Sequence, residues 1–337
     1  MNVPTLEELI ARSHVVSLPL TTPFRGLTHR EAIIFDAEVS PAEWSPFLEY
    51  DDGEAARWLA SAIEQGWTPS PWGKDLPTQI HVNGTIPAVS PDHVEALIER
   101  AGHPRTVKVK VGGPGTTLAD DVARVAEVRR VLGPTGRIRI DANGSWNVDE
   151  AEHAIRAMEP LDLDYVEQPV TSVPEMADIR SRISRLGIQV AADESIRRWS
   201  DLESVIAAEA CDLVVLKVQP LGGLEATRAL INTAEAAGLG VVLSSALDTS
   251  VGLYQAAQLQ AHLEHSRDQW HDAGLGTGSF FGNDIVTTPL IPQGGVMTIS
   301  PPELDDDAVQ RFSASPERTE WWLQRLLRCW NQLYKPE

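Results

Sequence analysis

Between about residues 79 and 275, short apolar segments alternate with longer segments in which apolar residues recur every three to four positions. The short segments are rich in valine, isoleucine and leucine, which is typical of buried strands, and the longer ones are typical of amphipathic helices. The alternation predicts about seven strand–helix units and a parallel sheet covered by helices. The strand-like segments are QIHVNG, TVKVKVG, RIRIDAN, YVEQP, IQVAADE, LVVLKV and VVLSSAL, with a weak eighth near HDAGLG.

Four of these segments end in a charged residue, at nearly equal intervals of about 25 residues, the length of one strand, one crossover helix and two short loops. The four are Asp141, Glu167, Asp193 and Lys217. The carboxyl ends of parallel strands in a barrel meet at one mouth, where enzymes of this architecture keep their active sites. We therefore predict an α/β fold with a TIM-type (β/α)7β barrel, in which three carboxylates and a lysine converge.

A pair of lysines belongs to the preceding unit. Lys108 and Lys110 lie two positions apart in TVKVKVG, so both side chains leave one face of the strand, while Val107, Val109 and Val111 take the other. A single lysine there would often reach solvent along the barrel wall. Two inward ammonium groups are costly without partners, and the nearby carboxylates would offset that cost.

The two ends of the chain are predicted to form one α+β capping domain, residues 1–78 plus 283–337, on a catalytic barrel domain of residues 79–282. The ends hold seven of the ten tryptophans. An apolar stripe at helical spacing within 317–333 needs an apolar partner, and we interpret it as core rather than as a ligand site. Its members are Trp322, Leu326, Cys329 and Trp330.

Composition narrows the expected partners and location. The net charge of −20 argues against nucleic acid and anionic membranes, because both need basic surface. No stretch approaches the roughly 18 consecutive apolar residues of a membrane span, and MNVPTLEELIARS lacks a basic start and an apolar signal core. The two cysteines, Cys211 and Cys329, form no disulfide framework. A cytoplasmic location is expected.

The strings KVKVG, DANGSW, VEQP, ADES and LKVQPLGG resemble the catalytic signature of the enolase superfamily, in its muconate-lactonizing subgroup with a lysine on each side of the site. Within that subgroup the chain most resembles the dehydratases of menaquinone biosynthesis. The resemblance covers the whole barrel, and the terminal segments more loosely. Its motifs are specific to the superfamily and much less specific to the reaction, since racemases, cycloisomerases and epimerases share them.

The resemblance implies that Asp141, Glu167 and Asp193 bind Mg²⁺, with Mn²⁺ able to substitute. Three carboxylates suit an octahedral ion whose remaining positions accept water and a substrate carboxylate. The residues alone also allow the alternative that these acids pair with the lysines in a buried ion network. Glu194 is expected to point away from Asp193 along the strand and, with Asn143, to support the site from behind.

The resemblance also implies that Lys110 is the catalytic base, with Lys108 as its neighbour, and that Lys217 holds its ammonium against the intermediate from the opposite side. A lysine with the reference pKa of about 10.4 is almost wholly protonated at neutral pH. The base therefore needs a lowered pKa, which Lys108 and the cation would supply by repulsion. The expected step removes a proton next to a carboxylate and gives an enediolate that the ion stabilises.

Two arginines are expected to contact the substrate. Arg139 precedes Asp141 by two positions on the same strand face and could bridge toward Lys110. Arg25 lies in a turn-rich stretch between apolar runs, which predicts a mobile loop over residues 20–30 that closes over a ligand.

A glycine-rich run at 274–282 follows the last strand-like segments. With Ser244 and Ser245 at the end of the seventh strand, its first residues Gly274 and Leu275 could receive a substrate carboxylate, because backbone amides in this region of a barrel commonly hold anions. An ordinary loop is the alternative.

The implied reaction is the Mg²⁺-dependent syn dehydration of 2-succinyl-6-hydroxy-2,4-cyclohexadiene-1-carboxylate to 2-succinylbenzoate. The first alternative is an N-succinylamino acid racemase, or another racemase or epimerase of the superfamily, with Lys110 and Lys217 as bases on opposite faces. A second, of another class, is a non-catalytic binding protein on the same barrel, which the intact key positions disfavour. The expected partner is a small dicarboxylate, and the sequence specifies no oligomeric state.

Overall fold

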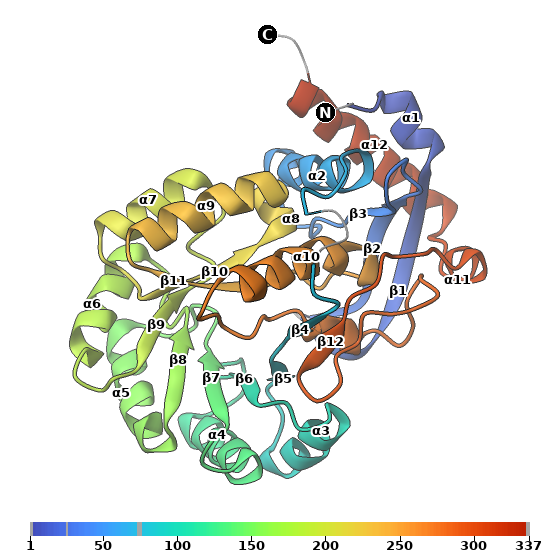
Figure 1. Cartoon of the computed structure of the whole chain (residues 1–337). Coiled ribbons are helices and arrows are strands. Elements are labelled where there is room, and N and C mark those ends of the chain that lie inside the picture. The colour runs from blue at the N-terminus through green and yellow to red at the C-terminus, as the bar shows by residue number, and fades with distance from the viewer. Residues whose placement is uncertain (1–2, 25, 73–75, 335–337) are drawn as a thin grey trace.

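The computed structural model of the chain describes residues 3–24, 26–72 and 76–334. A cap built from both ends of the chain sits on one side of a larger part, in which helices surround a curled parallel sheet (Figure 1). Both termini lie at the cap end of the molecule (Figure 1).

The cap is a three-stranded antiparallel sheet packed with helices from both chain ends. In this sheet β1 (Ser13–Phe24) pairs with β2 (Leu27–Phe35), and β2 pairs with β3 (Ala42–Trp44). Helices α2 (Asp52–Trp67) and α12 (Pro316–Tyr334) pack against each other beside the sheet. The remaining cap helices are α1 (Leu6–Ala11) and α11 (Asp306–Arg311).

The tryptophan-rich stripe near the C-terminus is core, as predicted. Trp322, Leu326 and Cys329 are fully buried on α12, within a cluster that also holds Trp44 and Trp58. The rings of Trp44 and Trp322 meet edge to face with their centroids 5.4 Å apart, an arrangement that aromatic pairs favour. The two chain ends therefore share one apolar core.

The larger part is built on a parallel sheet of seven strands with the order β11-β10-β9-β8-β7-β6-β5. Along the chain its strands are β5 (Gly84–Ile86), β6 (Thr106–Lys110), β7 (Arg137–Asp141), β8 (Leu163–Glu167), β9 (Gln189–Ala192), β10 (Leu213–Lys217) and β11 (Gly240–Ser244). Its helices are α3 (Val94–Arg100), α4 (Leu118–Leu132), α5 (Val148–Met158), α6 (Val173–Ile183), α7 (Trp199–Ala207), α8 (Val218–Leu221), α9 (Leu224–Ala236) and α10 (Ser250–Ser266). Its described residues also form the short 3₁₀ helices η1 (Pro91–His93), η2 (Glu159–Leu161) and η3 (Gly276–Phe280).

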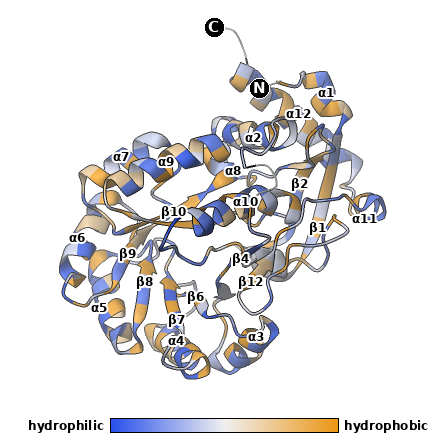
Figure 2. Cartoon of the chain, viewed as in Figure 1, coloured by the Kyte–Doolittle hydropathy of each residue, from blue (hydrophilic) through white to orange (hydrophobic). Residues whose placement is uncertain are grey.

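The helices of this part begin where the sequence supplies capping groups. Thr117, Asn147 and Ser172 each accept a hydrogen bond from the third backbone N–H of α4, α5 and α6, and the acidic residue there bonds back to the cap. Such reciprocal bonds satisfy two backbone donors that a helix start leaves unpaired. Figure 2 shows the result, apolar strands and apolar inner helix faces beneath polar outer faces.

The structure differs from the prediction at both edges of the sheet. Only the first half of the segment QIHVNG lies outside the parallel sheet, because β4 (Gln79–His81) pairs antiparallel with β12 (Val296–Thr298). Its last residue, Gly84, begins β5, the first strand of the parallel sheet. The segment near HDAGLG forms only the single parallel bridges Val82–Ala273 and Ser244–Gly274. The curled parallel sheet is thus established, and the complete (β/α)7β barrel stays a prediction, as do the domain limits.

Residues 20–30, predicted as a loop, belong mostly to the hairpin formed by β1 and β2, since the strands extend to Phe24 and resume at Leu27. Gly26 at the hairpin tip has a φ of +76°, which favours glycine. Arg25 lies outside the described residues. No helix in the described part of the chain is long and apolar enough to cross a bilayer.

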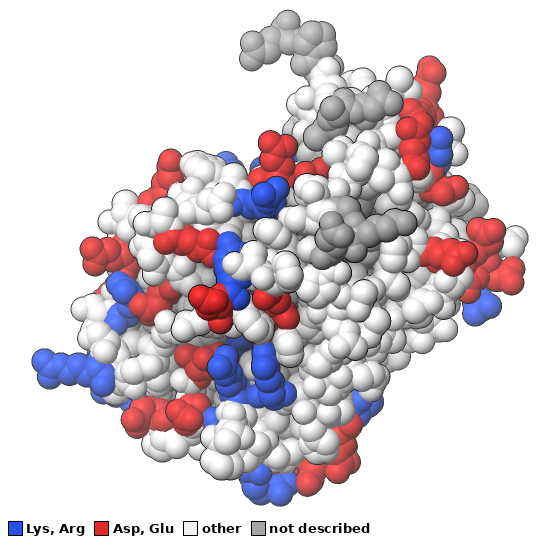
Figure 3. Space-filling view, viewed as in Figure 1, with Lys and Arg blue, Asp and Glu red and all other residues white. Residues whose placement is uncertain are grey.

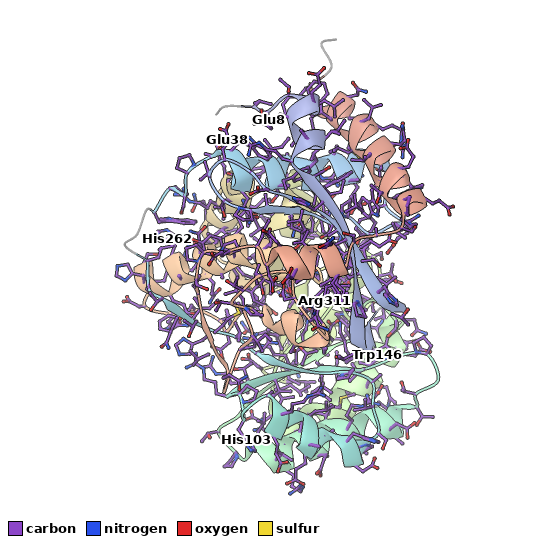
Figure 4. The ribbon with its side chains drawn as sticks, turned by 90° about the vertical axis from the view of Figure 1, so that its right-hand side faces the viewer. Glu8, Glu38, His103, Trp146, His262 and Arg311 are labelled. Atoms are coloured by element: carbon purple, nitrogen blue, oxygen red, sulfur yellow. The ribbon has the colours of Figure 1, made fainter. Side chains whose placement is uncertain are left out.

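The two parts occupy opposite ends of the molecule. In the view turned by 90°, Glu8 and Glu38 lie at the cap end and His103 lies at the far end of the larger part (Figure 4). Acidic side chains on the face seen in Figure 3 are spread over both parts rather than gathered in one patch.

Candidate active site

Strand register brings the predicted site residues to one edge of the sheet. Lys110 is the register partner of Asp141, and Asp141 is the partner of Glu167. Glu167 in turn pairs with Ala191, so Asp193 lies two residues farther, just beyond the end of β9. Lys217 is the last residue of β10. The carboxyl ends of five strands, β6 to β10, therefore supply the charged groups.

A cavity of about 630 Å³ opens at this edge, with walls from both parts of the molecule. Lys108, Lys110, Asp193 and Lys217 line it, whereas Asp141 and Glu167 are fully buried. The cap contributes the hairpin tip and an aromatic group, namely Gly26, Phe47, Tyr50 and Trp58.

The lysines and carboxylates form close ion pairs, with Lys108 and Lys110 at Asp141 and Lys217 at Asp193. The Nζ atom of Lys108 lies 3.0 Å from Asp141 Oδ2 and 2.9 Å from Glu167 Oε1. Lys110 Nζ lies 2.5 Å from Asp141 Oδ2, and Lys217 Nζ lies 2.5 and 2.6 Å from the two oxygens of Asp193. Among the described residues, no three acidic, histidine or cysteine side chains are arranged ready to share one metal ion. The Lys108 ammonium lies between two of the carboxylates instead.

Burial and charge shift the pKa values of this network in opposite directions. Burial opposes ionisation of Asp141, but the ammonium groups of Lys108 and Lys110 outweigh it and lower the Asp141 pKa. Burial likewise disfavours charge on Lys108, yet Asp141 and Glu167 raise its pKa well above the ordinary value. Burial of Asp193 is outweighed by Lys217 and by Arg197, so its pKa is also lowered.

Glu167 behaves differently from the other two acids. Burial, followed by the negative charge of Asp141, raises its pKa to about 8, although Lys108 opposes this shift. Burial is the larger cause of this shift, and repulsion between the Glu167 and Asp141 carboxylates adds to it. An oxygen-rich, electronegative donor set on adjacent strand ends fits a hard divalent cation such as Mg²⁺.

Comparisons with known proteins agree with this geometry. Residues 91–303 match the family described as enolase C-terminal domain-like, and residues 15–66 match enolase N-terminal domain-like. The o-succinylbenzoate synthase of Mycolicibacterium smegmatis is 40% identical over 97% of this chain and 98% of its own. The o-succinylbenzoate synthase of Mycobacterium tuberculosis is 39% identical over 98% of this chain and 97% of its own.

The chain belongs to the o-succinylbenzoate synthase family of the enolase superfamily. This is a family of carbon–oxygen lyases, as the resemblance had implied. Solved structures share the fold at low identity. Muconate lactonizing enzyme from Pseudomonas putida has a TM-score of 0.72 at 20% identity, covering 90% of this chain and 98% of its own. N-succinyl Arg/Lys racemase from Bacillus cereus has a TM-score of 0.71 at 20% identity, covering 90% and 96%.

In this member of the o-succinylbenzoate synthase family, Asn143 and Glu194 both line the cavity. Asn143 accepts a hydrogen bond of 2.8 Å from Lys110 Nζ and donates one of 3.0 Å to Glu194 Oε1. The prediction that Glu194 points away from Asp193 is wrong. Strand alternation no longer applies to either residue, because β9 ends at Ala192.

Arg139 and Leu275 do not reach the cavity. Arg139 shares the inner strand face as predicted, but it is fully buried one layer deeper, where it donates to Asp164, to Asn83 Oδ1 and to the Asp272 carbonyl. Leu275 is fully buried in the apolar core of the larger part. The predicted substrate contacts of these two residues, and the bridge from Arg139 toward Lys110, are therefore not seen.

Ser244, Ser245 and Gly274 do line the cavity. Their donors are directed at neighbouring protein groups, however. Ser244 Oγ donates to the Gly274 carbonyl at 3.3 Å, and Ser245 Oγ lies 3.0 Å from the same carbonyl and 2.7 Å from Thr277 Oγ1. Their role as substrate contacts stays a prediction.

The sequence reasoning missed Arg197 and the aromatic residues Phe47, Tyr50 and Trp58, all of which line the cavity. The abundance of tryptophan in the terminal segments predicts no particular site, and Trp58 is both core and cavity wall. Arg197 carried a signal that was not used, because it follows ADES, the segment that supplies Asp193, by only two residues.

Proposed function

We propose that the protein catalyses the Mg²⁺-dependent syn dehydration of 2-succinyl-6-hydroxy-2,4-cyclohexadiene-1-carboxylate to 2-succinylbenzoate, a step of menaquinone biosynthesis. The observation that carries the proposal is the placement of Lys110 on β6 and Lys217 on β10, facing one cavity from different strands. The names of relatives about 40% identical over nearly the whole chain support this reaction.

Asp141, Glu167 and Asp193 would hold the Mg²⁺. When bound, the ion would stabilise negative charge that develops on the substrate carboxylate. The residues fit this role because they are carboxylates at or just beyond the ends of adjacent strands, and carboxylate oxygens are the ligands that Mg²⁺ prefers.

In the proposed reaction Lys110 transfers the proton and Lys217 stabilises the anionic intermediate. Lys110 Nζ takes the proton from the carbon next to the carboxylate, and the C–H electron pair enters the carboxylate system. The electrons then return to form the ring double bond as the C–O bond breaks, and Lys110 gives its proton to the departing hydroxyl, which leaves as water. Because both groups leave from one face, one base suffices. Lys217 holds its ammonium toward the anion.

The cap aromatic residues form part of the cavity wall and would exclude water from a bound substrate. Trp58 is fully buried and Phe47 nearly so, although both form part of the wall. A cavity with a lower dielectric strengthens the attraction between the Lys217 ammonium and the developing anion.

A racemase is the second candidate. A syn dehydration needs one proton-transferring group, yet lysines reach the cavity from two different strands, Lys110 from β6 and Lys217 from β10. A second lysine on the opposite face is the arrangement that a two-base racemisation of an N-succinylamino acid requires.

Ultraviolet absorption tests the first candidate directly. With Mg²⁺ and the cyclohexadiene carboxylate, the aromatic product should appear with enzyme and not after chelation of the metal. Proton exchange in D₂O into each enantiomer of an N-succinylamino acid tests the second. Exchange without any dehydration would replace the first candidate by the second, and inactivity in both assays would reject both.

A further inference from the structure

A fourth cationic side chain faces the cavity. Arg197 lies between β9 and α7, and its side chain is 22% exposed. All of its side-chain hydrogen bonds within the described structure use Nη1, which donates to the Asp193 carbonyl at 3.1 Å, to Asp193 Oδ1 at 3.4 Å and to the Ile196 carbonyl at 3.3 Å. Among the described residues, Nε and Nη2 have no hydrogen-bond partner.

The unused edge of this guanidinium has the geometry of a carboxylate receptor. The N–H groups on Nε and Nη2 lie side by side, so they can donate two parallel hydrogen bonds to the two oxygens of one carboxylate. The loop that carries Arg197 is anchored, because Asp201 Oδ2 accepts from the backbone N–H of Arg197 at 2.9 Å and of Arg198 at 2.8 Å. The receptor edge is therefore held in place before a ligand arrives.

The position of Arg197 separates it from the reacting end. Lys110 lies on β6 and Arg197 follows β9, with β7 and β8 between them in the sheet order. Arg197 and Tyr50 of the cap both line the cavity. A ligand whose reacting carbon lies at Lys110 can extend across the mouth toward Arg197, under the cap.

The other candidate anion receptors are less available. The Ser244 and Ser245 hydroxyl groups point to the Gly274 carbonyl and to Thr277. The ammonium groups of Lys108 and Lys217 are held by the buried carboxylates. Arg197 is thus the cavity cation that combines a fixed backbone with two unused donors.

We propose that Arg197 binds the carboxylate at the far end of the substrate side chain, and that this contact makes the enzyme specific for dicarboxylates. The inference rests on the proposed function, because it assigns the succinyl carboxylate of that substrate to Arg197. Arg197 is then a specificity-determining residue rather than a base or an acid of the reaction.

Calorimetric titration of two ligands tests the assignment in the presence of Mg²⁺. The first ligand is the product, 2-succinylbenzoate, and the second is 2-butyrylbenzoate, in which a methyl group replaces the far carboxylate. Arg197→Gln should lower the affinity for 2-succinylbenzoate by about 10- to 100-fold, because charge-assisted hydrogen bonds to the far carboxylate are lost. Binding of 2-butyrylbenzoate should change by less than about twofold.

Arg198→Gln is the matched control, because it removes the same charge from the next residue, which is exposed and does not line the cavity. It should leave the affinities for both ligands unchanged. Arg197→Lys keeps the charge but loses the planar fork, so it should restore part of the affinity for the dicarboxylate. In turnover, Arg197→Gln should raise KM much more than it lowers kcat.

If Arg197→Gln lowered the affinity for both ligands equally, the proposal would be overturned. Such a result would indicate that Arg197 acts only by holding Asp193 in position. Unchanged binding of both ligands would overturn it as well. If Arg197→Gln does not fold, Arg197→Lys provides the test. An affinity for 2-succinylbenzoate relative to 2-butyrylbenzoate that equals the wild-type ratio would reject the assignment. Failure of the wild-type protein to bind 2-succinylbenzoate or to dehydrate the substrate would count against the proposed function itself.

Discussion

At the residue scale, the chemistry depends on ammonium groups that share buried carboxylates. Lys110 and Lys108 both bond to Asp141, whereas Lys217 bonds to Asp193. Because Lys110 and Lys217 depend on different acids, replacing one of these two should leave the other's contacts largely intact. Substitutions of Lys110 and Lys217 can therefore separate proton transfer from charge stabilisation.

Lys110→Ala should abolish both dehydration and proton exchange, with a loss of about a thousandfold or more, because it removes the group that transfers the proton. Stopped assays of product absorption and of deuterium incorporation measure the two reactions. Arg130→Ala is the control. It removes one positive charge from an exposed site on α4 and should leave the rates of both reactions nearly unchanged. Retention of dehydration by Lys110→Ala would exclude this lysine as the base.

Lys217→Arg should distinguish the two candidate reactions. Arginine keeps the positive charge but is not deprotonated in proteins, so it can stabilise an anion and cannot act as a base. We expect a measurable part of the dehydration to survive, about 1 to 10%, and exchange into the enantiomer that faces this residue to disappear. Loss of both activities to the level of Lys217→Ala would show that charge alone is insufficient.

At the element scale, α12 fastens the C-terminal end of the chain to the cap. Trp322 is fully buried on this helix, and its indole N–H donates to Glu31 Oε2 on β2 at 2.9 Å. Arg318 on the same helix also pairs with Glu31. The helix thus combines an apolar stripe with a polar anchor on the cap sheet.

Trp322→Ala should lower the free energy of unfolding by about 3 to 5 kcal/mol, the usual cost of removing a buried aromatic side chain. Urea denaturation followed by circular dichroism measures the change. Leu327→Ala, on the same helix but 36% exposed, is the control and should cost far less. A similar loss for both variants would contradict the assignment of the stripe as core.

At the scale of the whole molecule, a buried polar cluster joins the cap to the larger part. Glu43 of β3 accepts hydrogen bonds from the backbone N–H groups of Thr249 and Gly252 at the start of α10, at 3.0 and 3.1 Å. Arg30 of β2 donates to the Leu247 carbonyl at 3.1 Å. Burial, followed by the negative charge of Asp248, raises the Glu43 pKa to about 7.

The cluster predicts a pH dependence of stability. The Glu43 pKa in the folded protein lies above its ordinary value of 4.5, so the stabilisation by the protonated form is complete below about pH 4.5 and is lost as the pH rises through 7. We expect the free energy of unfolding of the wild-type protein to fall by an amount on the order of 2 kcal/mol between pH 5 and pH 8 because Glu43 ionises. In Glu43→Gln the side chain cannot ionise, so this part of the fall should disappear. Urea denaturation at the two pH values measures it, and an unaltered decline in the variant would show that Glu43 is not its source.

The cap also predicts a response to ligand. Gly26 at the hairpin tip lines the cavity, so a ligand that fills the cavity should restrict residues 20–30. Backbone amides of that segment should exchange more slowly with D₂O when Mg²⁺ and 2-succinylbenzoate are bound, whereas those of the distant α3 should not change. Equal exchange with and without ligand would show that the hairpin does not close over the cavity.

Local periodicity determined much of this protein. The strand at 106–110 and the helix near the C-terminus follow from residue spacing alone, because alternation and helical stripes are short-range properties. The common edge of Asp141, Glu167 and Lys217 follows as well, since parallel strands present their carboxyl ends together. The family motifs added the roles expected of these residues.

Only the tertiary structure decided the contacts that depend on long-range packing. The pairing of β4 with β12 places Gln79–His81, the first half of QIHVNG, outside the parallel sheet, although its pattern resembles the neighbouring strands. Arg139 is on the predicted face but lies a layer too deep to reach the cavity. The cavity wall formed by Trp58 and the unused edge of Arg197 arise where segments distant in sequence meet, and spacing along one chain carries no information about such depth or proximity.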